Sequence, residues 1–238
     1  MHSSRPALVF VPGFMQRGDS WRAVAERAEP YRSICLDPDT WTLADRVAEI
    51  RAASPPGAVL VGYSLGGRIA LRALFEDPAR FAALVLVGAS AGIDDRQERE
   101  ARLAADEKLA SWIERRPIEE VVDGWERQAA FASQSPELVE AQRPGRLSHD
   151  PEHLAELLRT AGQGAMEPVW RKLPKLRQPL LAVAGEDDEL YARAAQRMAS
   201  LAPKGTARLV PGAGHAPQLE QPDAVAALLR EFLDEHFG

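Results

Sequence analysis

The stretch LVGYSLGGRIAL, Leu60–Leu71, places a serine between two glycines, each two residues away. An apolar run precedes it and a stretch with helical periodicity follows, so the G-x-S-x-G pattern of Gly62, Ser64 and Gly66 falls at a strand-to-helix turn. Glycines in that setting permit a tight turn that lifts the serine hydroxyl above the end of a sheet. The pattern therefore predicts an activated serine, with an incidental serine in a glycine-rich turn as the alternative.

The composition is that of an ordinary globular protein. The chain has 238 residues, of which 45% are hydrophobic and 27% charged, enough for one large domain or for a core with an insertion. The net charge of -6 argues against a nucleic-acid-binding surface. Only four of the 29 basic residues are lysines, so an anionic ligand would mostly meet the planar, bidentate cation of arginine.

The sequence also predicts a compartment. Cys35 is the single cysteine, which excludes an internal disulfide, and its apolar surroundings predict a buried, inert thiol. The first residues contain no long apolar segment typical of a signal peptide, and no window approaches 18 uninterrupted apolar residues. We therefore expect a cytoplasmic protein that does not insert into a membrane.

Short apolar runs alternate with longer amphipathic stretches along the chain. The runs predicted as strands are Ala7–Val11, Ser33–Leu36, Ala58–Val61, Ala83–Val87, Leu180–Ala184 and Ala207–Val210. The segments predicted as helices are Leu43–Ala53, Gly66–Glu76, Ala192–Leu201 and Ala224–Phe237. This alternation predicts an α/β fold, a mostly parallel sheet flanked by helices on both faces.

The alternation is interrupted once. From about residue 91 to residue 174 the chain shows charged amphipathic stretches broken by prolines, and no convincing strand. We expect residues 91–174 to form a helical lid inserted after the fourth strand, and residues 1–90 and 175–238 to form the core.

A serine hydroxyl is a weak nucleophile and base alone, so the motif predicts a histidine and a carboxylate in the chain order serine, acid, histidine. His215 follows the strand Ala207–Val210 and is the candidate. The other histidines, including His149 and His153 in the inserted segment, are expected at the solvent-exposed surface. A loop histidine without a catalytic role is the alternative for His215.

The acid lies in the sequence Gly185-Glu186-Asp187-Asp188, directly after the fifth predicted strand. Asp188 is the preferred candidate because it occupies the fourth position of G-x-x-D. Asp187 then becomes a loop or helix-capping residue. Spacing alone leaves Glu186 and Asp187 open as alternatives.

An oxyanion hole requires two N–H donors. One is expected from Leu65, the residue after the serine, and the other from Phe14 in the loop after the first strand. Pro12 precedes that loop's glycine, where many α/β-hydrolases have histidine. Proline has no N–H but leaves the Phe14 donor intact, so the hole can persist with a different loop packing.

Arg68 follows the serine by four residues and should lie one helical turn away, on the same face. A cation in the first turn of a helix opposes the helix dipole by a few tenths to about 1 kcal/mol, a cost that an anionic ligand would offset. The alternative is a solvated arginine or one paired with a carboxylate of the insertion.

Four segments together carry a resemblance to a known family: GYSLGGR at Gly62–Arg68, the pattern from Glu98 to Asp106, WERQAAFAS at Trp125–Ser133, and Arg143–Trp170. They resemble the 2-succinyl-6-hydroxy-2,4-cyclohexadiene-1-carboxylate synthases of menaquinone biosynthesis, which have the α/β-hydrolase fold. The likeness spans nearly the whole chain, and the segments of the insertion are far more particular than G-x-S-x-G.

The resemblance implies a site for a substrate with three carboxylates, which the family binds with arginines. The matching positions here are Arg68, Arg102 and Arg146, and Tyr63 and Trp125 match pocket positions.

Arg99 lies one turn before Arg102 and is the alternative to it. Without the resemblance, Arg102 and Arg146 would be interpreted as surface residues of the insertion, and Trp125 as part of its core.

The first hypothesis is therefore a lyase. It eliminates pyruvate from 2-succinyl-5-enolpyruvyl-6-hydroxy-3-cyclohexene-1-carboxylate, with the triad serine as general base. The second is a serine hydrolase of a small acidic ester, thioester or carbon–carbon substrate. The third, less favoured, is a non-catalytic receptor for a small acid. No metal-binding spacing and no nucleotide-binding glycine loop occurs, so we expect no cofactor.

Overall fold

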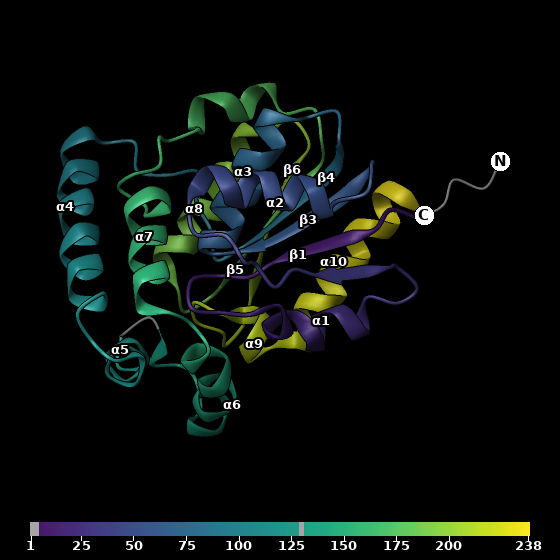
Figure 1. Ribbon diagram of the computed structural model, residues 1–238. Helices are drawn as coiled ribbons and strands as arrows, with labels where there is room; N and C mark the ends of the chain where they lie inside the picture. Colours follow the sequence, from purple (N-terminus) through teal and green to yellow (C-terminus); the bar gives the residue numbers. More distant parts are fainter. Residues whose placement is uncertain (1–4, 129–130) are drawn as a thin grey trace.

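The computed structural model describes residues 5–128 and 131–238 of the chain. Its centre is a six-stranded sheet in the order β2-β1-β3-β4-β5-β6, in which every pairing is parallel (Figure 1). The strands are β1 (Leu8–Val11), β2 (Ser33–Cys35), β3 (Ala58–Tyr63), β4 (Phe81–Val87), β5 (Leu180–Gly185) and β6 (Gly205–Val210).

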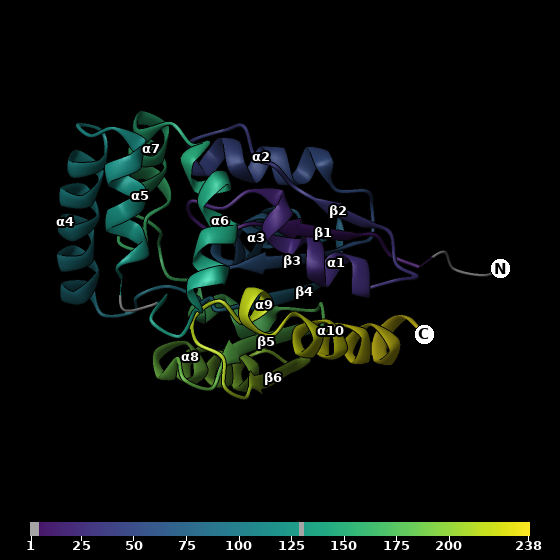
Figure 2. The ribbon, with the colours of Figure 1, turned by 90° about the horizontal axis from the view of Figure 1, so that it is seen from below.

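Alternate side chains of each central strand enter two separate hydrophobic clusters. In β1, for example, Val9 and Val11 face one cluster while Leu8 and Phe10 face the other. Figures 1 and 2 show the helices that cover the two faces. One face is covered by α2 (Leu43–Ala53), α3 (Leu65–Glu76) and α8 (Glu189–Leu201), and the other by α1 (Arg22–Arg27), α9 (Pro217–Glu220) and α10 (Pro222–Phe237).

The predicted α/β fold is confirmed, and each predicted strand and helix is present within a few residues. Two details differ from the sequence prediction. The edge strands β2 and β6 are only partly buried, because each has a single neighbour in the sheet. The short helices η1 (Gly18–Trp21), α1 and α9 were not predicted, since they span one or two turns and show little periodicity.

The segment between β4 and β5 contains four α-helices and, within its described residues, no strand. They are α4 (Arg96–Ile113), α5 (Ile118–Glu126), α6 (Pro136–Leu147) and α7 (Pro151–Ala161), followed by the short helix η3 (Trp170–Lys175). Proline at the start of α6 and α7 fits a first turn that needs no N–H donor, and Ser135 and Asp150 cap these two helices. Figure 1 shows α4–α7 gathered beside the sheet.

The inserted helices pack on the sheet through apolar side chains. Ile113 of α4, Val121 of α5 and Leu154 of α7 belong to the same buried cluster as the sheet face that α3 covers. The described part of the insertion therefore shares its hydrophobic core with the sheet.

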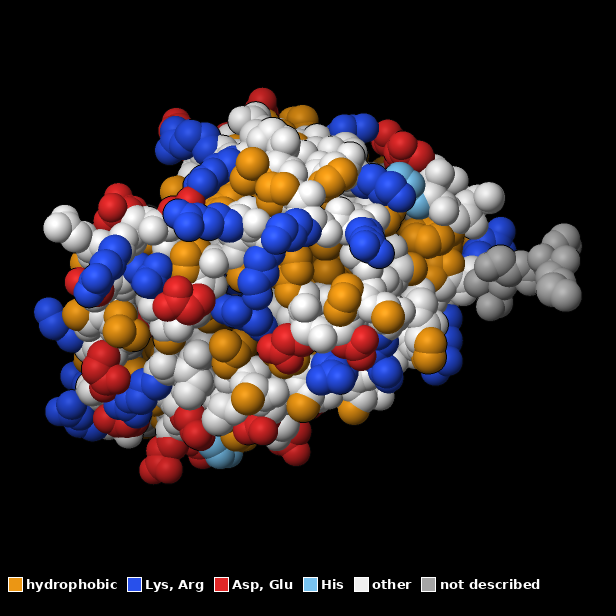
Figure 3. All heavy atoms as spheres, turned by 90° about the horizontal axis from the view of Figure 1, so that it is seen from above, with side chains coloured by type: hydrophobic (Ala, Val, Ile, Leu, Met, Phe, Trp, Pro, Cys, Tyr) orange, Lys and Arg blue, Asp and Glu red, His pale blue; other side chains and the backbone are white. Residues whose placement is uncertain are grey.

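Charges are distributed over the surface. On the face shown in Figure 3, Lys and Arg side chains are scattered among acidic and apolar ones. Many arginines have a carboxylate partner, such as Arg197 with Asp94 and Arg159 with Glu114. Among the described residues, no helix is long and apolar enough to cross a membrane.

The free Cys35 is partly exposed on edge strand β2, so the expectation of a buried thiol is wrong. Partial burial still raises the pKa of its thiol.

Candidate active site

The turn between β3 and α3 holds Ser64 in a strained backbone conformation, with φ of 49° and ψ of -112°. A positive φ is costly for a residue with a side chain, and such strain concentrates at functional sites. Neither motif glycine has room for a side chain: a Cβ on Gly66 would clash with the Pro12 carbonyl oxygen, and one on Gly62 would lie 2.6 Å from the Gly67 Cα. Both motif glycines are therefore required by close approach of the backbone.

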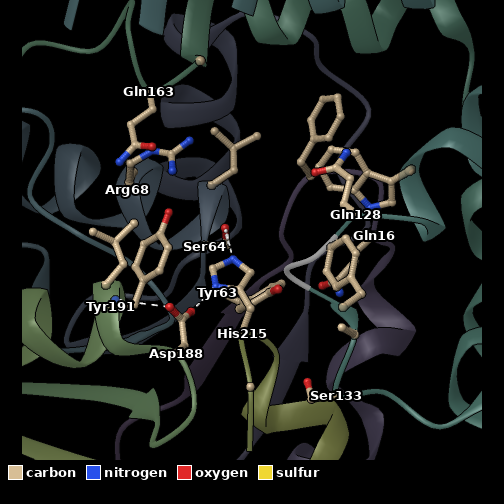
Figure 4. A pocket seen from close by; sticks show the side chains of 18 of the residues that line it. Gln16, Tyr63, Ser64, Arg68, Gln128, Ser133, Gln163, Asp188, Tyr191 and His215 are labelled. Carbon is tan, nitrogen blue, oxygen red and sulfur yellow. Dashed lines mark hydrogen bonds and ion pairs between the residues drawn. The ribbon is translucent and has the colours of Figure 1, made fainter. Parts of the chain in front are cut away.

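Ser64, His215 and Asp188 form a continuous hydrogen-bonded chain (Figure 4). Ser64 Oγ lies 3.2 Å from His215 Nε2, and His215 Nδ1 lies 2.7 Å from Asp188 Oδ2. The imidazole is largely buried, with 12% of its side chain exposed, and its ring centroid lies 4.6 Å from that of Tyr191. This geometry allows the imidazole to withdraw the serine proton while the carboxylate orients and stabilises the ring.

Among the acids that spacing left open, Asp188 is the one bonded to the histidine. Glu186 and Asp187 are exposed. Asp188 also caps α8, because its Oδ1 accepts a hydrogen bond from the Tyr191 amide at 3.3 Å. Of the two roles expected for Asp187, it has the loop position, because Asp188 both orients the imidazole and caps the helix.

The loop after β1 lies beside Ser64. Phe14 and Leu65 both line the cavity. Within the described chain, neither amide donates a turn, loop or cap hydrogen bond to a backbone carbonyl. The Gly13 amide donates to Gln16 Oε1 at 3.4 Å. Gln16 thus provides a side-chain acceptor for this loop, in which Pro12 replaces the more usual histidine.

A cavity of about 850 Å³ opens above Ser64, between the sheet edge and the inserted helices. Its size is in the range of small-molecule sites. One wall is aromatic: Trp125 of α5 lies 5.1 Å from Phe14 and 5.6 Å from Phe131, measured between ring centroids. The rest of the lining is largely polar and includes Ser64, Arg68, Gln128, Gln163, Tyr191 and His215 (Figure 4).

Arg68 is the outstanding polar group of this cavity. Only 8% of the residue is exposed, its Nε is buried without a hydrogen-bond partner, and the guanidinium forms no ion pair among the described residues. Burial lowers its pKa. A buried cation without a partner is costly, and among the described residues no carboxylate offsets that cost for Arg68.

Arg102 of α4 also lines the cavity, but the protein holds it in place. Its Nε donates to Asp106 Oδ1 at 2.7 Å and its Nη1 to Gln163 Oε1 at 2.9 Å. Asp106 is 2% exposed and also accepts from the Gly164 amide. The alternative, Arg99, pairs with Glu167 at 3.5 Å and does not line the cavity, so the structure places Arg102 at the site.

Arg146 of α6 lines the cavity and is 2% exposed, but its charge is already paired. Its Nη1 donates to Glu126 Oε1 at 2.9 Å and its Nη2 to Gln142 Oε1 at 2.8 Å. Its guanidinium carbon also lies 5.7 Å from the centroid of the Phe131 ring. Of the three candidate arginines, then, only Arg68 lacks a carboxylate partner within the described chain.

Tyr63 and Trp125, the two aromatic candidates, both line the cavity. Burial raises the pKa of the Tyr63 phenol well above its usual value, so this group stays neutral.

Sequence reasoning missed several polar residues of the lining, among them Gln16, Gln163 and Tyr191. A signal existed only for Tyr191, which lies three residues after the triad aspartate, in the first turn of α8.

The expectation of an exposed His149 is wrong. This residue, between α6 and α7, is 7% exposed, and neither ring nitrogen has a partner in the described chain. Burial, reinforced by the charges of Arg17 and Arg46, lowers its pKa to about 4. His153 is partly buried and stacks on Trp41, with ring centroids 4.3 Å apart. These contacts join the insertion to the core and lie outside the cavity.

No group of three or more histidine, cysteine, aspartate or glutamate side chains suited to a metal ion occurs in residues 5–128 and 131–238.

Comparison with known proteins gives concordant matches. The model of the alpha/beta hydrolase family matches residues 8–228. A 2-succinyl-6-hydroxy-2,4-cyclohexadiene-1-carboxylate synthase of Serratia proteamaculans is 31% identical, over 97% of this chain and 94% of the relative. A protein described as a putative enzyme of the same name from Bacillus subtilis is 34% identical. That match covers 73% of this chain and 65% of the relative, just under two thirds of its length.

Solved structures are similar over almost the full length. A structure titled MenH from S. aureus has a TM-score of 0.90 and 27% identity, and the match covers 99% of this chain and 96% of that one. A malate-bound esterase from Thermogutta terrifontis has a TM-score of 0.76 and 25% identity, over 100% of this chain and 92% of that one.

Proposed function

We propose a pyruvate-eliminating lyase activity for this chain, which belongs to the alpha/beta hydrolase family and, within it, to the 2-succinyl-6-hydroxy-2,4-cyclohexadiene-1-carboxylate synthases. Its substrate is 2-succinyl-5-enolpyruvyl-6-hydroxy-3-cyclohexene-1-carboxylate, and its products are the cyclohexadiene for which the family is named and pyruvate.

One observation carries the proposal: a hydrogen-bonded serine, histidine and aspartate share a cavity with a buried, unpaired guanidinium. The bonded chain of Ser64, His215 and Asp188 supplies a base. Arg68 supplies a positive charge, without a carboxylate partner in the described chain, one helical turn from the serine. A substrate with three carboxylates offers the anion that this position lacks.

The reaction begins at the ring carbon that bears the succinyl group. Ser64 Oγ takes the proton from this carbon while its own hydroxyl proton passes to His215 Nε2. The electron pair of the broken C–H bond forms a new ring double bond, the existing one shifts by one position, and the C–O bond to the enolpyruvyl group breaks. The proton held by His215 returns to the departing enolpyruvate, which becomes pyruvate.

Negative charge develops on the ketone oxygen of the succinyl arm during proton abstraction. The amides of Phe14 and Leu65 are the proposed donors to that oxygen, and the loss of one such donor costs on the order of 100- to 1,000-fold in rate. No covalent intermediate on the serine is required. The fixed amides lower the barrier because they are oriented before the charge appears.

The arginines have unequal roles in this proposal. Arg68 binds one carboxylate directly, since nothing in the described chain neutralises it. Arg102 presents its second amino group, because Asp106 and Gln163 occupy Nε and Nη1. Arg146, paired with Glu126, contributes hydrogen bonds more than net charge. Trp125 packs against the ring of the substrate, and Tyr63 completes the wall beside the serine.

We further propose that residues 91–174 act as a lid on the core formed by residues 1–90 and 175–238. The helices of this segment supply Arg102, Trp125 and Arg146 to a cavity whose base is the sheet edge. Closing a site over a charged substrate strengthens every electrostatic contact within it. We also propose that the enzyme acts in the cytoplasm, on a small anionic substrate formed there.

A serine hydrolase of a small acidic substrate is the second candidate. The same three residue types activate a nucleophile in hydrolases. A malate-bound esterase has a similar fold, which supports hydrolysis as the alternative reaction. Fold alone does not separate the two activities, because superfamilies with one fold host many reactions.

The experiment combines two measurements on purified protein with the proposed substrate. We expect continuous release of one pyruvate per substrate consumed, and a protein mass that stays unmodified during turnover. A burst followed by an acyl adduct on Ser64 would establish the hydrolase. An active preparation of a known family member serves as the control for substrate quality, and a lack of pyruvate release beside it would exclude the lyase.

A further inference from the structure

The side chain of Tyr191 has a place in the cavity that the proposed mechanism does not use. Tyr191 lies in the first turn of α8, three residues after the triad aspartate, and is partly buried. Its amide donates a hydrogen bond to Asp188 Oδ1 at 3.3 Å, and its ring packs on the imidazole of His215 with ring centroids 4.6 Å apart. The backbone and ring are therefore fixed by the two residues that activate the serine.

The hydroxyl of this tyrosine points away from the triad. In Figure 4 it is directed toward Arg68. Arg68 Nε is buried without a hydrogen-bond partner in the described chain, and Tyr191 and Arg68 line the same cavity. Two donor groups thus face the same part of the cavity.

We infer that Tyr191 is a substrate-binding residue whose hydroxyl, together with the guanidinium of Arg68, donates to one carboxylate of the ligand. A carboxylate accepts hydrogen bonds at both oxygens, so it satisfies both donors at once. Because the ring of Tyr191 also packs on His215, the position of this carboxylate is tied to the position of the base. The inference rests on the proposed function for the identity of the substrate, but the donor pair is defined by the cavity alone.

The test is Tyr191→Phe, which keeps the ring against His215 and removes only the hydroxyl. We expect KM for the pathway substrate to rise roughly 10- to 100-fold, as for a lost hydrogen bond to a charged group, with kcat within about threefold. The unfolding temperature should not change. Tyr31→Phe is the matched control, because its hydroxyl faces Asp234 on the far side of the core, and it should leave both constants unchanged. An unchanged KM, or a loss confined to kcat, would overturn the assignment.

A second measurement separates this inference from the proposed function. Binding of isophthalate, a ring dicarboxylate, is measured by calorimetry for three proteins. They are the Ser64→Ala enzyme, the same enzyme with Tyr191→Phe added, and the same enzyme with Arg68→Met added. We expect each additional substitution to weaken binding roughly tenfold or more. If the wild-type enzyme releases no pyruvate but both added substitutions lower the affinity for isophthalate, the proposed function fails and the binding role of Tyr191 stands. Equal affinity with and without the hydroxyl, or no binding by either form, overturns that role.

Discussion

The amide of Arg68 donates a hydrogen bond to the carbonyl oxygen of Ser64 at 3.1 Å, which fixes the arginine one helical turn from the serine hydroxyl. A cation therefore stands in the first turn of α3, against the helix dipole. The backbone sets the separation between Arg68, the proposed carboxylate-binding group, and Ser64, the proposed base. In this proposal, binding and chemistry are coupled through one turn of helix.

Arg68→Met should separate stability from affinity. The substitution removes a buried charge without a partner, so we expect the free energy of unfolding to rise by about 1–3 kcal/mol while substrate affinity falls by about 100-fold. Arg102→Met is the comparison, because it leaves the buried carboxylate of Asp106 without its cation and should destabilise the fold. Urea unfolding and KM measure the two effects. Destabilisation by Arg68→Met would contradict this account of the cavity.

Asp188→Asn should reduce kcat by roughly 100-fold or more, because an amide cannot stabilise the imidazolium that forms when His215 accepts the proton. Asp187→Asn should have a much smaller effect, and Glu186→Gln, in an exposed side chain outside the cavity, should have none. Steady-state rates of pyruvate release compare the three variants. A similar loss in all three would mean that the loop as a whole, and not the Asp188 carboxylate, supports the histidine.

The sequence predicted the serine, acid and histidine of the site, but not how the side chains of the inserted helices are paired and buried. Ser64 follows directly after β3, Asp188 follows β5 and His215 follows β6, so local patterns located them. The pairing of Arg146 with Glu126 and the burial of His149 depend on how the inserted helices pack on one another and on the core. Such contacts join residues far apart in the chain, and charge patterns alone do not reveal them.

His149 should make the protein less stable in acid. Its pKa in the folded protein is lowered to about 4 from an ordinary value of 6.5, so the unfolded chain binds more protons between these values. Stability is therefore fully present above about pH 6.5 and falls as pH decreases toward 4, by on the order of 2–3 kcal/mol for this group.

His149→Leu should flatten this part of the stability profile, because leucine fills the buried site and takes up no proton. His236→Gln, near the end of α10, should leave the profile unchanged. Urea unfolding at a series of pH values between 7 and 4 provides the comparison. An unaltered slope in His149→Leu would show that other groups cause the acid sensitivity.

Ser64→Ala should lower kcat by about 100- to 10,000-fold and leave substrate binding nearly intact, since the methyl group removes the base but none of the proposed carboxylate contacts. Ser200→Ala, at an exposed position of α8, is the matched control. Loss of binding together with turnover would mean that the hydroxyl holds the ground-state substrate.

The central claim, that Ser64 removes a carbon-bound proton, is tested most directly by the substrate deuterated at the ring carbon beside the succinyl ketone. The account predicts that deuterium slows pyruvate release severalfold in kcat/KM and that the enzyme mass stays unmodified throughout. Equal rates for the two isotopic forms, together with a covalent adduct on Ser64, would contradict it.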